Sequence, residues 1–404
     1  MKVKHGHRAM PHADPARTPA SHVRPWRVLH ACGRLADVAA LVDGESAAGM
    51  FPQVVAGWRA GESAHASPGL MTAWHDVRRW RALLDEADPM GVSEVLHAHS
   101  FSAGMAAVRR VPVVVYDISS FVEDVDNGAE APGAWVSRSF QVAEQFVISR
   151  AGATVVRGLA ARERALARGA QPEHLFVAPQ PLSAQQLQIT AAGSNPSDGG
   201  DGVCFYCAGV PLLAGGRLTP ELLSLLRAMA AVAAEVEGVR LSLELDDAAS
   251  EAQVRGELVE LGVGLPVTLV AAPMRSGRLQ AADVVLLQDA WAGSFALGLE
   301  AMLHARALLA ADTPAHRDLS RQGRGCVWFR PGDLRDLACR AAFLARNQDF
   351  LRSLGAAGCR HALATRSPAA VAETYDPIYR HAVQRQRNRP DVPWTGLQLA
   401  RACI

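Results

Sequence analysis

The chain has 404 residues, which at roughly 100–200 residues per domain corresponds to two or three domains. Lysine and arginine number 41 against 40 aspartates and glutamates, giving a net charge of +1. The basic surplus typical of nucleic-acid-binding proteins is absent, so we expect no nucleic-acid partner. Lys2 and Lys4 are the only lysines in the sequence, which excludes Schiff bases, phosphate-loop lysines and lysine general bases from the body of the chain.

The seven cysteines do not follow a disulfide pattern, because their number is odd and their spacing is irregular. Cys204 and Cys207 form a single C-x-x-C motif inside the apolar run VCFYCAG. We interpret this run as a buried strand rather than as a redox or zinc site. No run of 18 apolar residues and no hydrophobic signal segment occurs. We therefore expect a cytoplasmic location, with the inner face of the membrane as the alternative.

The first half of the chain alternates short apolar runs with longer amphipathic stretches, a pattern typical of β-α-β units and a parallel sheet. Residues 1–25 precede this pattern and are polar and aperiodic, so we expect a disordered tail there. The expected elements are strands at 27–32, 53–57, 93–99, 111–118, 153–158 and 175–179, and helices at 35–42, 70–87, 102–110, 135–151 and 159–169.

The second half repeats the alternation after a stretch, 182–202, that fills with Gly, Ser, Asn and Asp. We take this stretch as a linker. The expected elements are strands at 203–209, 239–245, 266–272, 282–289, 306–312 and 326–331, and helices at 220–236, 252–262, 295–305 and 333–347.

The two alternations predict an α/β protein with two Rossmann-like parallel-sheet domains that face a central cleft. We place the domains at residues 26–185 and 203–380, with the linker at 186–202. Ligands of such folds bind at the carboxyl ends of the strands. Residues 381–404 form a C-terminal extension, which we expect to pack against the N-terminal domain, with contact to a membrane or a partner protein as the alternative.

Four segments resemble the family-4 glycosyltransferases of the GT-B fold. LHAHSFSAGMAA (96–107) is similar to the family pattern hHAHs..ag..a, and residues 146–181 are similar to the pattern RADAVI..S..LR..L...G.P.ERI.VIPN. LQAADVVLLQDAWAGSFALGLEAM (279–302) resembles Y..ADVFV.PS..EGFGL..LEAMA, and residues 306–338 resemble PVVATD.GG..E.I..G..G.LV.PGD...LA. VYDISSFVEDVDNG (115–128) looks most like a subgroup associated with exopolysaccharide and exosortase gene sets.

The resemblance implies a nucleotide-sugar donor site in the C-terminal domain. It implies that Glu300 reaches the donor ribose, on a helix whose N-terminus faces the diphosphate; a helix-surface carboxylate is the alternative interpretation. A helix N-terminus favours phosphate oxygens without any lysine. Gly293 and Ser294 precede that helix, where a close backbone approach and a hydroxyl donor would help. Arg217 and Arg275 are the candidate guanidinium contacts to the diphosphate.

The N-terminal domain supplies further candidates. His97 and His99 alternate along an expected strand, so both side chains are expected on one face near its carboxyl end. His99 and Asp117 are candidates for contact with donor or acceptor, and Asp117 stands near the place where many family members have a histidine. Glu123 and Asp124 are cleft candidates in the next loop, and a solvated loop or a satisfied core histidine is the alternative. Gly33 corresponds to the family's first Gly-rich loop, where the backbone approaches a phosphate or sugar.

The sequence departs from the family pattern at several positions. Ala292 stands where the family has the first carboxylate of its E-x7-E motif, the loop GVPLLAGGRLTPE has no lysine, and the first Gly-Gly loop is reduced to Gly33. No nucleophile motif and no metal site are expected, since the fold class works without either. The leading hypothesis is a retaining glycosyltransferase (a hexosyltransferase) that uses a nucleotide-sugar donor and a glycan, lipid-linked or small-molecule acceptor. A catalytically impaired scaffold or binding partner in polysaccharide biosynthesis and a sugar-nucleotide epimerase are the alternatives.

Overall fold

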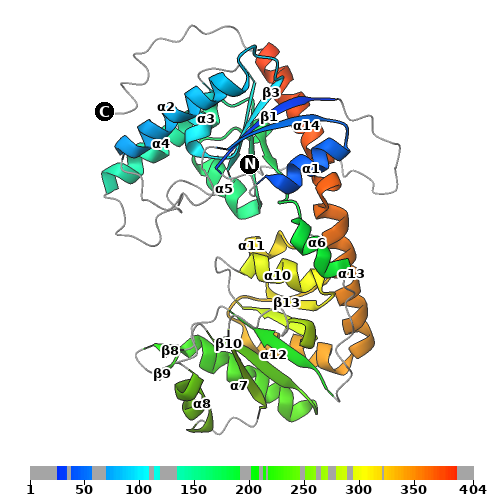
Figure 1. Cartoon of the computed structure of the whole chain (residues 1–404). Coiled ribbons are helices and arrows are strands. Elements are labelled where there is room, and N and C mark those ends of the chain that lie inside the picture. The colour runs from blue at the N-terminus through cyan, green and yellow to red at the C-terminus, as the bar shows by residue number, and fades with distance from the viewer. Residues whose placement is uncertain are drawn as a thin grey trace, which may run out of the picture.

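Two six-stranded parallel sheets, each flanked by helices, form two domains stacked along the long axis of the molecule (Figure 1). The computed structural model describes residues 25–33, 38–56, 70–108, 113–118, 134–191, 202–208, 213–214, 217–245, 251–260, 265–271, 279–288, 294–320 and 323–388. Apart from Pro25, the tail expected at 1–25 lies outside these residues, as do Glu123 and Asp124.

The N-terminal sheet has the strand order β2-β1-β3-β4-β5-β6. The order reverses between β1 and β3, and such a switch point is where open α/β sheets bind ligands, at the carboxyl ends of the strands. The elements are β1 (Arg27–Cys32), α1 (Ala39–Ala47), β2 (Phe51–Ala56), α2 (Leu70–Ala87), β3 (Val95–Ala98), α3 (Phe101–Ala107), β4 (Val114–Ile118), α4 (Ala134–Arg150), β5 (Ala153–Val156), α5 (Leu159–Ala167) and β6 (Leu175–Val177).

The C-terminal sheet has the order β11-β10-β7-β12-β13-β14, and its switch point lies between β7 and β12. A separate two-stranded sheet, β8-β9, was not expected. The elements are α6 (Ala184–Ala191), β7 (Cys204–Cys207), β8 (Leu213–Ala214), β9 (Arg217–Leu218), α7 (Pro220–Glu235), β10 (Arg240–Leu245), α8 (Glu251–Glu260), β11 (Val267–Ala271), β12 (Val284–Leu287), α10 (Ser294–Leu303), β13 (Ala307–Ala311), α11 (Pro314–Arg317), β14 (Cys326–Phe329), α12 (Leu334–Arg346), α13 (Gln348–Arg366) and α14 (Pro368–Arg387).

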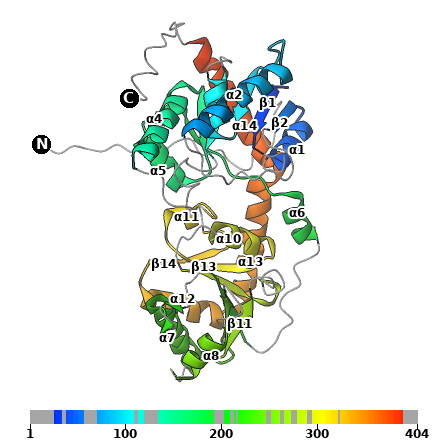
Figure 2. The ribbon, with the colours of Figure 1, turned by 60° about the vertical axis from the view of Figure 1, so that its left-hand side comes forward.

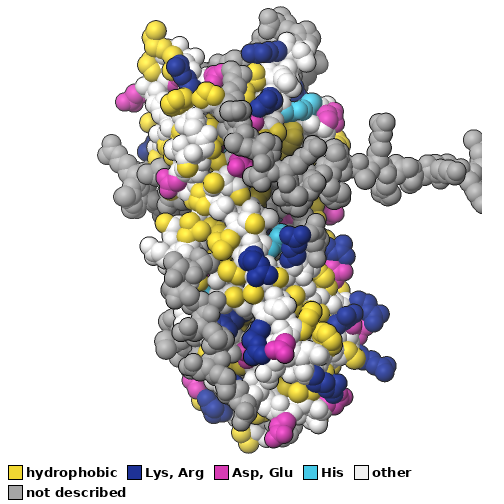
Figure 3. Space-filling view, turned by 90° about the vertical axis from the view of Figure 1, so that its right-hand side faces the viewer, with side chains coloured by type: hydrophobic (Ala, Val, Ile, Leu, Met, Phe, Trp, Pro, Cys, Tyr) yellow, Lys and Arg dark blue, Asp and Glu magenta, His cyan; other side chains and the backbone are white. Residues whose placement is uncertain are grey.

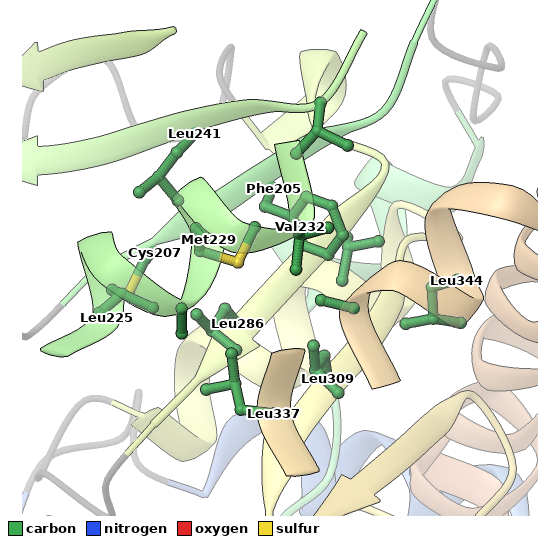
Figure 4. Packing of buried hydrophobic residues seen from close by; sticks show 14 of the residues in the cluster. Phe205, Cys207, Leu225, Met229, Val232, Leu241, Leu286, Leu309, Leu337 and Leu344 are labelled. Carbon is green, nitrogen blue, oxygen red and sulfur yellow. The ribbon is translucent and has the colours of Figure 1, made fainter. Parts of the chain in front are cut away.

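The core of the C-terminal domain is a layer of apolar side chains between the sheet and the helices α7 and α12. Phe205, Leu286 and Leu309 extend from three neighbouring strands toward Met229 and Leu337 of these helices (Figure 4). The strand expected at VCFYCAG is confirmed as β7, whose Cys207 is buried in this core. All six described cysteines are free thiols.

The expected linker contains a helix, α6, which the sequence interpretation missed. Ser183 caps α6 by accepting a hydrogen bond from the backbone N–H of Gln186 (3.2 Å), and the Gln186 side chain accepts one from the backbone N–H of Ser183 (2.9 Å). This reciprocal pair is a capping box, which favours helix initiation. Residues 192–201 of the linker lie outside the described part of the chain.

The last helix returns to the N-terminal domain from Pro368, earlier than the boundary expected at residue 380. Figure 1 shows α13 running along the lower domain and α14 continuing into the upper one. The backbone of Gly44 in α1 packs so closely on α14 that a Cβ there would lie 2.1 Å from the Pro368 carbonyl oxygen. Farther along α14, the Arg385 guanidinium donates to the Ala151 carbonyl oxygen (2.8 Å). Residues 389–404 of the expected extension lie outside the described chain.

Charges of both signs are interspersed on the surface of the lower domain, as the face in Figure 3 shows. This agrees with the balanced composition. Within the described residues, none of the helices combines the length and the apolar character that a membrane span requires.

Candidate active site

Three histidines meet at the switch point of the N-terminal sheet. The tetrapeptide VLHA occurs twice, in β1 and in β3, and the two copies pair in register, so that His30 lies beside His97. His99 follows two residues after His97, on the same face. His30 Nδ1 lies 3.0 Å from His99 Nε2, and the rings of His97 and His99 are 4.0 Å apart between centroids. One ring nitrogen from each histidine lies within 4.8 Å of one from each of the others, a spacing suited to a metal ion.

Asp117 in β4 anchors the polar side of this cluster. Its Oδ2 accepts hydrogen bonds from the Arg157 guanidinium and from the Tyr375 hydroxyl (3.0 Å). The same oxygen lies 3.5 Å from His97 Nε2 and 3.6 Å from His99 Nδ1. Asp117 is 1% exposed, so it sits inside the domain and not at the rim of an open cleft.

Helix α14 closes the cluster from the other side. The Tyr379 hydroxyl lies 2.6 Å from Glu45 Oε1 and 2.9 Å from His97 Nδ1. Glu45, on α1, also contacts His30 Nε2 at 2.7 Å. Glu45, His97 and Tyr379 are fully buried. The result is a continuous hydrogen-bonded network that joins both strands of the switch point to α1 and α14.

The environment of this network shifts the pKa values of its members. Burial and the neighbouring imidazole of His99 hold the pKa of His97 well below its usual range. Burial likewise lowers the pKa of His99, although Asp117 opposes this. Burial alone would raise the pKa of Asp117, but the Arg157 guanidinium and the two imidazoles keep it well below its ordinary value. The two histidines are therefore neutral and Asp117 is ionised at neutral pH.

The C-terminal candidates lie in a second region, around α10. Ser294 is the first residue of α10 and is buried, and Glu300 lies two turns farther along, half-buried. Arg217 is in β9, but its side chain is outside the described part of the structure. Gly293 and Arg275, like Ala292, fall in the segments 289–293 and 272–278, which are also outside it. Gly33 directly follows β1 and is half-buried.

A contact between the domains links α5 to the region around α10. The Asp318 carboxylate, after α11, accepts a hydrogen bond from the backbone N–H of Leu159 at the start of α5 (2.7 Å). The Arg366 guanidinium donates to the Asp318 carbonyl oxygen (2.8 Å) and lies 4.9 Å from the ring centroid of Phe295, in the first turn of α10. Figures 1 and 2 show α11 directly below α5.

The sequence predicted His97 and His99 on one face of a strand and Asp117 separately as a cleft candidate, but it did not predict most of the network. His30 carried a usable signal, the repeated VLHA. Tyr375 and Tyr379 are four residues apart on one helix face, but their partners lie more than 250 residues away, so no local pattern reveals them.

No protein-family model and no curated protein matches the sequence. Solved structures match the fold. HepE from Anabaena, in complex with UDP and glucose, covers 87% of this chain and 98% of its own at 12% identity and a TM-score of 0.52. Sucrose-phosphate synthase from Thermosynechococcus elongatus matches 88% of this chain over 98% of its own length, at 14% identity and a TM-score of 0.55. The lipopolysaccharide outer core galactosyltransferase WaaB matches 88% of this chain over 99% of its own length, at 12% identity and a TM-score of 0.57. The chain therefore has the GT-B fold of these glycosyltransferases.

Proposed function

We propose that this protein is a nucleotide-sugar-dependent glycosyltransferase. The observation that carries the proposal is the fold match, which extends over both domains to transferases, one of them solved with UDP and glucose. Family-4 membership is supported by the four sequence motifs, and a role in polysaccharide biosynthesis by the segment 115–128. A glycan, lipid-linked or small-molecule acceptor belongs to the same proposal. A uridine nucleotide is the first donor class to test.

The donor would bind at the start of α10, next to the switch point of the C-terminal sheet. The first turn of a helix presents unpaired backbone N–H groups and a partial positive charge, which suit a diphosphate. The Ser294 side chain lies in this turn, and Glu300 lies on the same helix within reach of a ribose. Arg217 and Arg275 would add guanidinium donors in place of the absent lysine.

The mechanism we propose is retaining, by front-face substitution. The leaving diphosphate is stabilised by the α10 N-terminus and by Arg217, so the protein needs no nucleophile of its own and the transfer itself no metal ion. Asp117 and His99 are assigned a positioning role, because Asp117 is buried and held by Arg157 and Tyr375. They fix the shape of the N-terminal switch point, where the acceptor would bind.

Isothermal titration calorimetry with UDP, GDP and ADP tests the donor site. We expect one nucleotide to bind, and the variant Glu300→Ala to weaken that binding by about 10–100-fold, the effect of losing a charge-assisted hydrogen bond of ~1.5–3 kcal/mol. Glu235→Ala is the matched control, because Glu235 is an exposed carboxylate of the same domain paired with Arg346. If no nucleotide binds to the folded wild-type chain, the proposed function is wrong.

A second candidate function is a non-catalytic binding partner of an active transferase. Ala292 replaces a donor-site carboxylate of the family pattern, and Asp117 is committed to an internal ion pair. This candidate predicts no turnover of any nucleotide-sugar. Release of free sugar or transfer product from UDP-glucose by the purified chain decides in favour of the enzyme.

A further inference from the structure

The hydrogen-bond directions in the histidine cluster leave ring nitrogens without a suitable partner. The Tyr379 hydroxyl has one proton, which it donates to Glu45 Oε1 (2.6 Å), so it must accept from His97 Nδ1 (2.9 Å). In the neutral ring, His97 Nε2 is then a lone pair. This atom is buried and has no hydrogen-bond partner among the described residues.

The same reasoning applies to His30. His30 Nε2 lies 2.7 Å from the Glu45 carboxylate and donates to it, so in the neutral ring Nδ1 is a lone pair that faces His99 Nε2 at 3.0 Å. If His99 directs its proton to Asp117, two lone pairs meet at 3.0 Å. If it directs its proton to His30, its Nδ1 lone pair faces the Asp117 carboxylate at 3.6 Å. In both arrangements of the neutral rings, a cation between them would give these lone pairs a partner.

The charges in the network point the same way. Its ionisable carboxyl groups are those of Glu45 and Asp117, both buried, and its permanent cation is Arg157. Two buried carboxyl groups beside one permanent cation give the cluster an electrostatic environment that favours a further cation.

We propose that His30, His97 and His99 bind a divalent transition-metal ion of the Zn²⁺ class at the switch point of the N-terminal sheet. Three neutral imidazoles, with a water molecule in the fourth position of a tetrahedron, are a typical Zn²⁺ ligand set. The outer nitrogens of His30 and His97 are hydrogen-bonded to Glu45 and Tyr379, which is the arrangement that orients metal-binding histidines. The outer nitrogen of His99 lies 3.6 Å from Asp117 Oδ2. The ring centroid of His30 lies 5.1 Å from that of His97 and 5.4 Å from that of His99, and one nitrogen of each ring lies within 4.8 Å of the others.

The role of the ion would be structural. His30 belongs to β1, His97 to β3, and Tyr379 ties His97 to α14, so the ion would fix the two strands of the switch point and the returning helix together. This inference is independent of the proposed glycosyl transfer, and its test reads out metal binding and not activity.

The test uses the full-length chain, freed of metal with a chelator and then titrated with Zn²⁺ against a chromophoric competitor. His5, His7, His12 and His22 lie in the N-terminal segment and can hold metal loosely, so a variant with all four replaced by Ala is the reference protein. We expect the reference to bind one Zn²⁺ per chain, and Co²⁺ to give the intense visible absorption of a tetrahedral site.

In the reference protein, His97→Gln should abolish this binding, and Glu45→Gln should weaken it by about 10–100-fold, the usual effect of losing an outer partner of a metal-binding histidine. His381→Gln is the matched control: His381 contacts His174 at 2.8 Å, outside the cluster, and its loss should leave the stoichiometry unchanged. His99→Gln replaces His97→Gln if the latter fails to fold by circular dichroism. The proposal is overturned if the reference binds no Zn²⁺, or if a folded His97→Gln or His99→Gln variant binds it as the reference does.

Discussion

Asp318 of the C-terminal domain caps a helix of the N-terminal domain. Its Oδ2 accepts a hydrogen bond from the backbone N–H of Leu159, the first residue of α5, at 2.7 Å. An acidic residue at this position accepts from one of the unpaired N–H groups of the helix, and its negative charge interacts favourably with the helix dipole. Because the cap crosses between domains, it links the stability of α5 to the relative position of the two sheets.

We therefore predict that Asp318→Ala lowers the free energy of unfolding by about 1 kcal/mol, the usual effect of a lost cap, and also loosens the arrangement of the domains. Small-angle X-ray scattering should show a larger radius of gyration. Asp333→Ala is the matched control, because Asp333 caps α12 inside one domain, accepting from the Asp336 N–H at 3.0 Å. It should cost the same free energy without changing the scattering. An equal scattering change in both variants would contradict the linkage.

Gly44 allows α14 to dock on α1. A Cβ at this position would lie 2.1 Å from the Pro368 carbonyl oxygen, a backbone atom that cannot move away cheaply. Gly44→Ala is expected to lower the free energy of unfolding of the N-terminal domain by about 1–3 kcal/mol or more, as overpacking does. Faster amide hydrogen exchange in α1 and α14 would report it.

Gly256 in α8 provides the opposite case, since a Cβ added there would have nothing within 4 Å of it. Gly256→Ala should stabilise α8 by roughly 0.5–1 kcal/mol, because alanine loses less backbone entropy than glycine in a helix. If both variants change stability by the same sign and amount, close packing at Gly44 is not the reason for its glycine.

Much of the fold follows from hydrophobic periodicity. The helix expected at 70–87 coincides with α2, and the strand expected at 27–32 coincides with β1. The helix α6 was missed because the composition of 182–202 resembles a linker, although Ser183 and Gln186 had the spacing of a capping box. Composition averages over a window, whereas a cap depends on two residues.

The candidate site was less accessible from sequence. Alternation along β3 placed His97 and His99 on one face, and the structure brings both to Asp117. The network is completed by α14, which returns to the N-terminal domain and brings Tyr379 to His97, 282 residues earlier in the chain. Such a contact is set by the packing of whole domains, and local patterns carry no information about it.

The Tyr379 hydroxyl serves two buried partners, and the Tyr375 hydroxyl serves Asp117. Tyr379→Phe leaves an oxygen of Glu45 and the N–H of His97 without a partner. Each unsatisfied group lowers the free energy of unfolding by about 1–3 kcal/mol. Tyr375→Phe is the matched control on the same helix face. Its loss of stability should be smaller, because Asp117 keeps its ion pair with Arg157. We expect urea unfolding to rank Tyr379→Phe as the less stable variant. The reverse ranking would show that the hydroxyl of Tyr379 is not the link between α14 and the cluster.

Breaking the ion pair of Asp117 and Arg157 should cause a large loss in the free energy of unfolding. Asp117 is 1% exposed and the Arg157 side chain 21%, so Asp117→Leu leaves a largely buried guanidinium without its counter-charge. We expect a loss of about 3 kcal/mol, at the lower end of the range for breaking a buried pair because Arg157 keeps some solvent and its bond to the Pro179 carbonyl oxygen.

Replacing both partners, as in Asp117→Leu with Arg157→Met, removes the stranded charge, so the double variant should be more stable than Asp117→Leu alone. A double-mutant cycle followed by urea unfolding measures this coupling. Strictly additive losses would mean that the two side chains act independently, with His97, His99 and Tyr375 holding Asp117 in place without Arg157.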